Sequence, residues 1–233
     1  MLPKIDVPVF ECFLHSLNKK VKFRSFTVKE EKILLVTKEE DDVRQMIGAI
    51  KQVMTNCLIT KVDLNKLAFF DFEYLFLNIR SKSVGDVIPI GIIDNEEKQT
   101  YTVNVNINDV KLNQHEDHNK VVPLTDKIGL MMKYPTMDGI IDITSRNAED
   151  DNEEAFEIIK NCIESVYEGE KVHSINDQTP EEVDEFFNSM ASEHFNKIQK
   201  FFDTMPRLKH EVKYKTKDGR EKIYLLEDVS DFF

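Results

Sequence analysis

The chain has 233 residues, of which 41% are hydrophobic and 32% are charged. This length and balance suit a soluble globular protein with one large or two small domains and a real core. No apolar run approaches the roughly 18 residues of a membrane helix, and the first residues lack the basic and apolar regions of a secretory signal. We therefore expect no membrane partner and a location in the cytoplasm of the cell that makes the protein.

The formal net charge of −12 has its source in one segment. Residues 149–193 contain 15 Asp and Glu but two Lys, whereas residues 194–222 contain nine Lys and Arg against four Asp and Glu. The acidic segment would repel nucleic-acid phosphates, and the basic patch is modest. We expect no nucleic-acid partner and, instead, a protein partner with a complementary basic surface.

Three cysteines, Cys12, Cys57 and Cys162, lie far apart along the chain. An odd and sparse set argues against a disulfide framework and suits a reducing compartment. Cys57 falls at an apolar helical position, so we expect a small buried hydrophobic residue there.

The N-terminal part of the chain predicts a strand pair followed by a short helix. Apolar, β-branched runs at 5–14 and 20–26 favour two strands. Thr27 and Glu30 have the spacing of a capping box, in which a hydroxyl and a carboxylate satisfy backbone donors at a helix start. This predicts a short helix through Val36.

Two longer helices come next. Apolar residues between Val43 and Cys57 recur at helical spacing and form one stripe. Residues 64–79 are apolar nearly all round, with Asp63 as the expected cap. A helix of that kind is usually central to its domain, so we expect it to be the buried spine of the N-terminal region.

The middle of the chain, residues 86–144, changes to a period of two and is expected to be rich in β-strands. Polar and apolar residues alternate over 101–107, which predicts a half-buried strand paired with 87–93 in a hairpin. Residues 128–134 give another alternating strand, and 140–144 a short further one.

The C-terminal third returns to helical spacing and closes with a hairpin. Thr179, Pro180 and Glu182 combine a cap, a proline at the first helical position and a capping carboxylate. Asp218-Gly219 suits a tight turn. We expect a helix over 155–167, then helical spacing that begins at Pro180 and continues to Met205, where Pro206 stops it. A hairpin of strands 211–214 and 223–226 follows.

Together these elements predict an α+β protein. It would have an N-terminal mixed region with two central helices, an antiparallel β-rich middle, and a helical C-terminal third with a terminal β-hairpin. The acidic stretch after residue 148 is the expected boundary, which gives a mixed region with a β-rich middle over 1–148 and an acidic helical region over 149–233.

Catalytic and metal-binding patterns are weak in this chain. His115-Glu-Asp-His118 could place two imidazoles on one helical face, but the flanking residues favour a loop, and zinc proteases need a different spacing on a helix. Cys12 and His15 would face opposite sides of a strand, which defeats a thiol–base pair. We therefore expect no enzymatic activity, no cofactor and no bound metal; a small metal-dependent hydrolase using His115 and His118 stays as the alternative.

Five segments follow one another along the chain in a recognisable order: Phe26–Leu35, Phe69–Gly85, Tyr134-Pro135, Phe201–Arg207 and the terminal Phe232-Phe233. The most specific is Phe69–Gly85, with its Phe-rich helix and Arg-Ser-Lys-Ser-Val-Gly ending. In their order and spacing these segments resemble the baseplate hub assembly and hub subunit family of T-even-like contractile-tailed bacteriophages.

The resemblance implies a phage tail protein that acts in baseplate hub assembly by protein–protein contact. It implies hub or tape-measure proteins as partners, the host cytoplasm during assembly as the location, and the tail baseplate of the virion as a second one. A permanent subunit and a transient assembly factor both stay open, as does a homo-oligomer.

Two kinds of side chain are candidates for partner binding. Arg80, Ser81 and Lys82 could grip an anion at a helix end, although helix-end charges in water are the alternative. Aromatic pairs are common anchors in partner pockets, which makes candidates of Phe201-Phe202 and Phe232-Phe233. The alternative for Phe201 and Phe202 is a place in the core.

Overall fold

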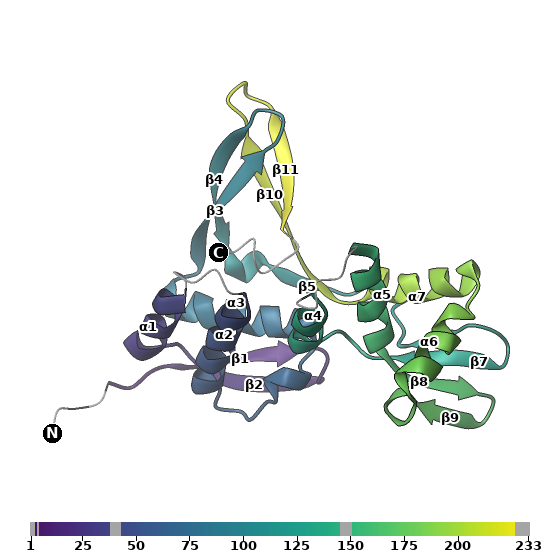
Figure 1. Cartoon of the computed structure of the whole chain (residues 1–233). Coiled ribbons are helices and arrows are strands. Elements are labelled where there is room, and N and C mark those ends of the chain that lie inside the picture. The colour runs from purple at the N-terminus through teal and green to yellow at the C-terminus, as the bar shows by residue number, and fades with distance from the viewer. Residues whose placement is uncertain (1–2, 4, 38–42, 145–150, 227–233) are drawn as a thin grey trace. The chain divides into compact units, whose positions relative to one another are not determined.

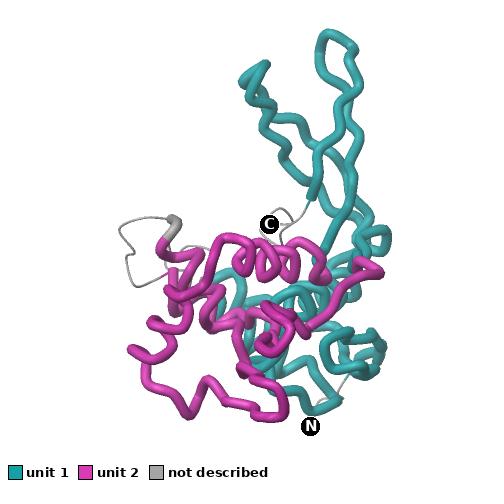
Figure 2. Tube along the Cα trace, turned by 90° about the vertical axis from the view of Figure 1, so that its right-hand side faces the viewer, with its two compact units in different colours: residues 1–113, 207–233 teal, residues 114–206 magenta. Residues whose placement is uncertain are grey.

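The computed structural model describes residues 3, 5–37, 43–144 and 151–226. The α+β class predicted from the sequence is confirmed, because helices and small antiparallel sheets alternate along the chain. Contacts divide the chain into two compact units (Figure 2), with residues 1–113 and 207–233 in unit 1 and residues 114–206 in unit 2. The division expected after residue 148 is a different one, and its boundary falls outside the described residues.

The described part of unit 1 contains a hairpin, three α-helices and a second set of strands (Figure 1). In chain order these are β1 Val9–Leu14, β2 Lys19–Arg24, α1 Val28–Thr37, α2 Val43–Cys57, α3 Phe69–Val84, β3 Val87–Asp94, β4 Gln99–Asn106, β5 Lys111–Asn113, β10 Arg207–Lys215 and β11 Glu221–Leu226.

Helix α3 is the buried spine that its apolar sequence predicts. Phe70, Phe72, Leu75 and Phe76 are all at most 2% exposed. The expected cap Asp63 accepts a hydrogen bond from Asn65 N, but it begins a separate turn, Leu64–Lys66, ahead of α3.

A charged side chain of α3 holds the first hairpin. Asp71 is fully buried, and its carboxylate oxygens accept the backbone N–H of His15 at 3.0 Å and of Ser16 at 2.6 Å. Buried carboxylates need such partners. Asp71 thereby fixes the end of β1 against α3.

Helix α1 begins with the predicted capping pair. Glu30 accepts hydrogen bonds from the backbone N–H of Thr27 at 2.9 Å and from its hydroxyl at 2.7 Å. Arg24 adds Nη2 to Oε1 of Glu30 at 3.1 Å. Burial raises the pKa of Glu30, but the bonds from Arg24 and Thr27 outweigh it and lower the pKa to about 2.

Two long hairpins of unit 1 pack on each other. β3 pairs with β4, and β10 pairs with β11 and, at its start, with β5. Both predicted hairpins are therefore confirmed, and Figures 1 and 2 show them extending together from the helices of unit 1. Their inward side chains form one apolar cluster with Leu77 of α3 and with Ile107 and Val110 of the turn after β4. The hairpin residues of this cluster are Ile88, Ile90, Ile92, Val105, Leu208, Val212 and Leu226.

Unit 2 is a four-stranded antiparallel sheet with helices packed against it. Its strands stand in the order β6-β7-β8-β9. The elements are β6 Val121–Pro123, β7 Ile128–Met132, α4 Met137–Thr144, α5 Asp151–Asn161, β8 Ile163–Glu168, β9 Lys171–Ser174, α6 Pro180–Asn188 and α7 Ser192–Thr204. Helices α6 and α7 add Phe186, Phe187, Ile198 and Phe201 to the core of this unit.

Two segments of unit 2 differ from the prediction. The expected strand 140–144 lies in helix α4, where Thr136 begins the helix by accepting Gly139 N at its hydroxyl, at 3.2 Å. The expected helix 155–167 ends at Asn161, and the rest of it is strand β8, paired with β7 on one side and β9 on the other. Pairing on both sides is a long-range effect that overrides the helical spacing of the apolar residues.

Candidate functional site

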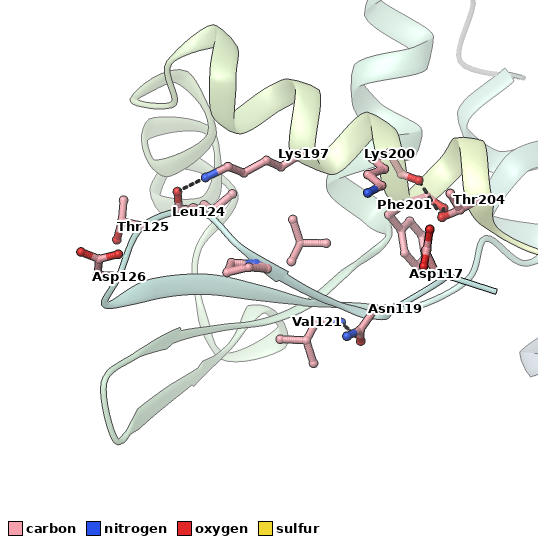
Figure 3. A pocket seen from close by; sticks show the side chains of 12 residues that line it. Asp117, Asn119, Val121, Leu124, Thr125, Asp126, Lys197, Lys200, Phe201 and Thr204 are labelled. Carbon is pink, nitrogen blue, oxygen red and sulfur yellow. Dashed lines mark hydrogen bonds between the residues drawn. The ribbon is translucent and has the colours of Figure 1, made fainter. Parts of the chain in front are cut away.

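A cavity of about 510 Å³ opens between helix α7 and the segment that enters and leaves strand β6 (Figure 3). Its apolar wall is made by Val121, Val122, Pro123 and Leu124, and Phe201 of α7 closes it. Polar residues surround these: Asp117, Asn119, Thr125, Asp126, Lys197, Lys200 and Thr204. Unit 2 contributes all of these residues, so the cavity belongs to one compact unit.

Helix α7 is tied to the far end of the cavity by a lysine. Lys197 donates from Nζ to the backbone oxygen of Leu124 at 2.6 Å. The same turn is held by Thr125, whose hydroxyl accepts the backbone N–H of Ile128 at 3.0 Å. Lys197 is therefore engaged within the fold, while Lys200, one helical turn further on, is exposed at the rim.

An aromatic cluster lies behind Phe201. The ring centroids of His118 and Tyr134 lie 5.1 Å and 5.8 Å from that of Phe201, and the His118 and Tyr134 rings stack at 5.5 Å. Such offset pairs add to the stability that burial gives. The wall of the cavity formed by Phe201 is thus firmly supported.

The hydrogen bonds of His118 set its tautomer. Thr204 donates its hydroxyl proton to the backbone oxygen of Lys200 at 2.7 Å, so it accepts from Nδ1–H of His118 at 3.0 Å. Nε2 of His118 is then the acceptor for the Tyr134 hydroxyl, also at 3.0 Å. Burial, followed by the charge of Lys120, lowers the pKa of His118 below 6.5, which keeps the ring neutral.

A family described as T4 bacteriophage base plate protein matches residues 7–233. The chain belongs to this family. No curated protein and no solved structure matches it. The protein therefore has a structural or assembly role in the phage tail baseplate, where other baseplate proteins are its partners.

In this baseplate protein, the aromatic candidates at 201–202 lie in unit 2. Phe201 is 2% exposed and lines the cavity, and the half-buried Phe202 packs edge-on against it at 5.1 Å. Both side chains pack in the core of unit 2, which is the alternative to partner binding that the sequence left open for them. Phe201 also lines the cavity. Phe232 and Phe233 lie outside the described residues.

The candidates at 80–82 lie in unit 1, at the end of α3, whereas Phe201 and Phe202 belong to unit 2. Ser81 is buried and donates to Asp86, and Lys82 donates from Nζ to Asp86 Oδ1 at 3.1 Å. Arg80 is half-buried, and burial lowers its pKa; its Nη1 has no hydrogen-bond partner within the described ranges. Ser81 and Lys82 thus close the helix end.

The two weak chemical patterns are also placed. The ring nitrogens of His118 both lie against hydroxyls, so a metal would have to displace one of those hydrogen bonds. Across the part of the chain that is described, no group of three His, Cys, Asp or Glu could hold a metal ion. Cys12 is buried in β1, and burial raises its thiol pKa to about 12.

Sequence reasoning missed the cavity itself. The segment 117–126 has no periodic pattern, and its contact with α7 joins positions more than seventy residues apart, as in the bond from Lys197 to Leu124. One signal was present: Lys197, Lys200 and Phe201 share a helical face, directly after an acidic segment.

Among the described residues, no helix combines the length and the apolar character that a membrane span requires.

Proposed function

We propose that this baseplate protein acts in assembly of the baseplate hub through protein–protein contacts, without catalysing a reaction. Hub or tape-measure proteins would be its partners, and the host cytoplasm the place where it meets them. The family match over residues 7–233 supports the baseplate part of this proposal. The cavity beside Phe201 supports contact with a protein segment.

The composition of the cavity suits a peptide. Apolar side chains from β6 and an aromatic ring from α7 would cover an apolar residue of a partner, and 510 Å³ lies within the range of ligand sites. Lys200 at the rim would attract a carboxylate near that residue. An apolar residue with an acidic neighbour is thus the kind of segment that we expect here.

Two variants test this site. Val121→Glu places a charge at an exposed residue on the cavity wall, and Lys200→Glu reverses the charge at its rim. Capture of co-expressed hub and tape-measure proteins by the full chain should fall at least tenfold for Val121→Glu and less for Lys200→Glu. Val172→Glu is the matched control, because Val172 is 69% exposed in the same unit and does not line the cavity. Unchanged capture by Val121→Glu would contradict the proposed site.

The basic end of α3, Arg80–Lys82, and the terminal Phe232-Phe233 are proposed as secondary contacts. Deletion of Phe232-Phe233 should weaken capture of the same partners while far-ultraviolet circular dichroism stays unchanged. Capture at the wild-type level after the deletion would remove the terminal pair from the proposal. Lys82→Gln tests the helix end by the same capture measurement. Because Lys82 pairs with Asp86, the folding of this variant is checked by circular dichroism as well.

The fate of the protein is a separate question with a direct measurement. Quantitative mass spectrometry of finished particles would find copies at the level of other baseplate proteins if it is a subunit. A transient assembly factor would be abundant in infected cells and absent from the particles.

A further inference from the structure

A second groove, which we name the acidic groove, lies in unit 2 between the sheet and helix α6. One wall is Ile128 of β7 and Val166 of β8; the other is Val183 and Phe186 of α6. Its volume is about 310 Å³. The residues of the Phe201 cavity line no part of it, so it is a separate surface.

The walls of the acidic groove are apolar but incompletely covered. Val166, Ile175, Val183 and Phe186 are each half-buried rather than buried, although all lie against the core of the unit or border it. Val183 and Phe186 are three positions apart and therefore share a face of α6. The groove leaves space for a large apolar side chain supplied from outside.

Two carboxylates stand at the edge of the groove. Glu168 follows Val166 on the same face of β8, and Glu182 lies in the first turn of α6. The backbone N–H of Thr179 donates to Oε2 of Glu182 at 2.8 Å, in a complete capping box that holds this carboxylate in place. Glu168 and Glu182 are both exposed, and neither forms an ion pair within the described ranges.

The surroundings of the groove are acidic as well. Residues 163–188 contain eight Asp and Glu and a single Lys. A partner with carboxylates beside its apolar residue would be repelled there, whereas lysine or arginine would be attracted. His173 lies opposite Val166 and is the one basic-type side chain among the described residues of the lining.

We propose that the acidic groove binds a partner segment in which a large apolar side chain is flanked by lysine or arginine. The apolar side chain enters between Val166 and Val183, and the flanking cations pair with Glu168 and Glu182. The inference rests on the proposed role in protein–protein contact and adds the chemistry of a second partner segment.

Synthetic peptides test this without any hub protein. A fluorescein-labelled nine-residue peptide with a central Leu between lysines is titrated with the full chain and followed by fluorescence anisotropy. It should bind at least tenfold more tightly than the same peptide with Ser in place of Leu, and than one with glutamates in place of the lysines. Affinity should fall as salt is raised. Equal affinity for the Leu and Ser peptides would overturn the proposal.

A matched pair of charge reversals locates the binding. Glu168→Lys and Glu170→Lys change the net charge equally, but only Glu168 lines the groove, since Glu170 lies in the turn after β8. The first should weaken binding of the Leu peptide at least tenfold and the second at most threefold. Equal losses would show long-range attraction alone and would sink the assignment to the groove.

Val183→Asn, checked for folding by circular dichroism, should also abolish the preference of the chain for the Leu peptide over the Ser peptide.

A second copy of the chain is the rival occupant, because it offers an apolar side chain beside a lysine: Ile223 of β11 is 62% exposed and pairs across the hairpin with Lys213. Sedimentation velocity decides this: self-association that Val183→Asn removes would assign the groove to a second copy and overturn the proposal. A variant that loses peptide binding at the acidic groove should still capture hub proteins through the cavity beside Phe201. The proposal for the groove and the proposed function can therefore fail independently.

Discussion

Lys222 of β11 donates from Nζ to Oδ2 of Asp94, at the end of β3, over 2.8 Å and across 128 positions of sequence. The same carboxylate oxygen accepts the Tyr214 hydroxyl at 2.8 Å, and Oδ1 accepts the backbone N–H of Glu96 at 3.0 Å. Asp94 is 3% exposed. The hydrogen bond from Lys222, together with the others, holds the pKa of Asp94 well below its usual range. One side chain thus joins the two hairpins.

Asp94→Asn should lower the thermal midpoint of unfolding, because a neutral amide loses the ion pair and one acceptor. Since the pKa of Asp94 is depressed in the folded state, its stabilising effect is present above its ordinary value of 3.8 and is lost as the pH falls below it. The gap between wild type and variant should therefore narrow in acid. Glu96→Gln, at a side chain 70% exposed, should cost less. Equal midpoints for all three proteins would contradict this role.

Glu30→Gln should destabilise the protein by about 2 to 4 kcal/mol, because it leaves Arg24 without its charged partner and weakens the start of α1. The Glu30 side chain is 1% exposed and that of Arg24 is 25% exposed. Urea denaturation measures the change. Glu11→Gln breaks a pair in which both side chains are about half exposed, with Lys22 at 3.5 Å, and should cost less than about 1 kcal/mol.

Gly129→Ala should destabilise the protein by about 1 to 3 kcal/mol, because a Cβ at this position would overlap the ring of Tyr167 on the neighbouring strand. In a Tyr167→Ala background the cost of Gly129→Ala should largely disappear, as a double-mutant cycle would measure. Gly48 of α2 has nothing within 4 Å of such a Cβ, and Gly48→Ala should stabilise by up to about 1 kcal/mol.

Stability should fall as the pH drops below 6.5, through His118. Burial lowers the pKa of His118, so the unfolded chain takes up the proton first, and the neutral ring contributes stability that is lost between 6.5 and its lower folded pKa. Urea denaturation across this range measures the slope. His118→Gln should flatten it, and His115→Gln, at a side chain 58% exposed, should leave it unchanged. A slope that survives His118→Gln would assign the effect elsewhere.

Local patterns predicted the elements that depend on local forces. The stripe of α2 and the alternation in β3–β4 each show a period that matches their structure, and the run that forms α3 is apolar nearly all round, as its buried place requires. The capping box at Thr179 forms in full, and Glu30 accepts the backbone N–H of Thr27 as expected, because each pair of residues lies only three positions apart. The spacing of Ile159, Ile163 and Val166 misled, since pairing with β7 and β9 decides β8.

The sequence by itself determined the α+β class, the main hairpins and the membership of a phage baseplate family. Only the tertiary structure decided that β10 returns to β5 and makes the C-terminal hairpin part of unit 1. It also decided that Lys197 meets Leu124, which closes the cavity beside Phe201, and that α6 faces Val166 across the acidic groove. These contacts join residues that are distant along the chain. Because the hydrophobic effect is non-directional, an apolar face in the sequence shows that the face is buried but not which distant segment covers it.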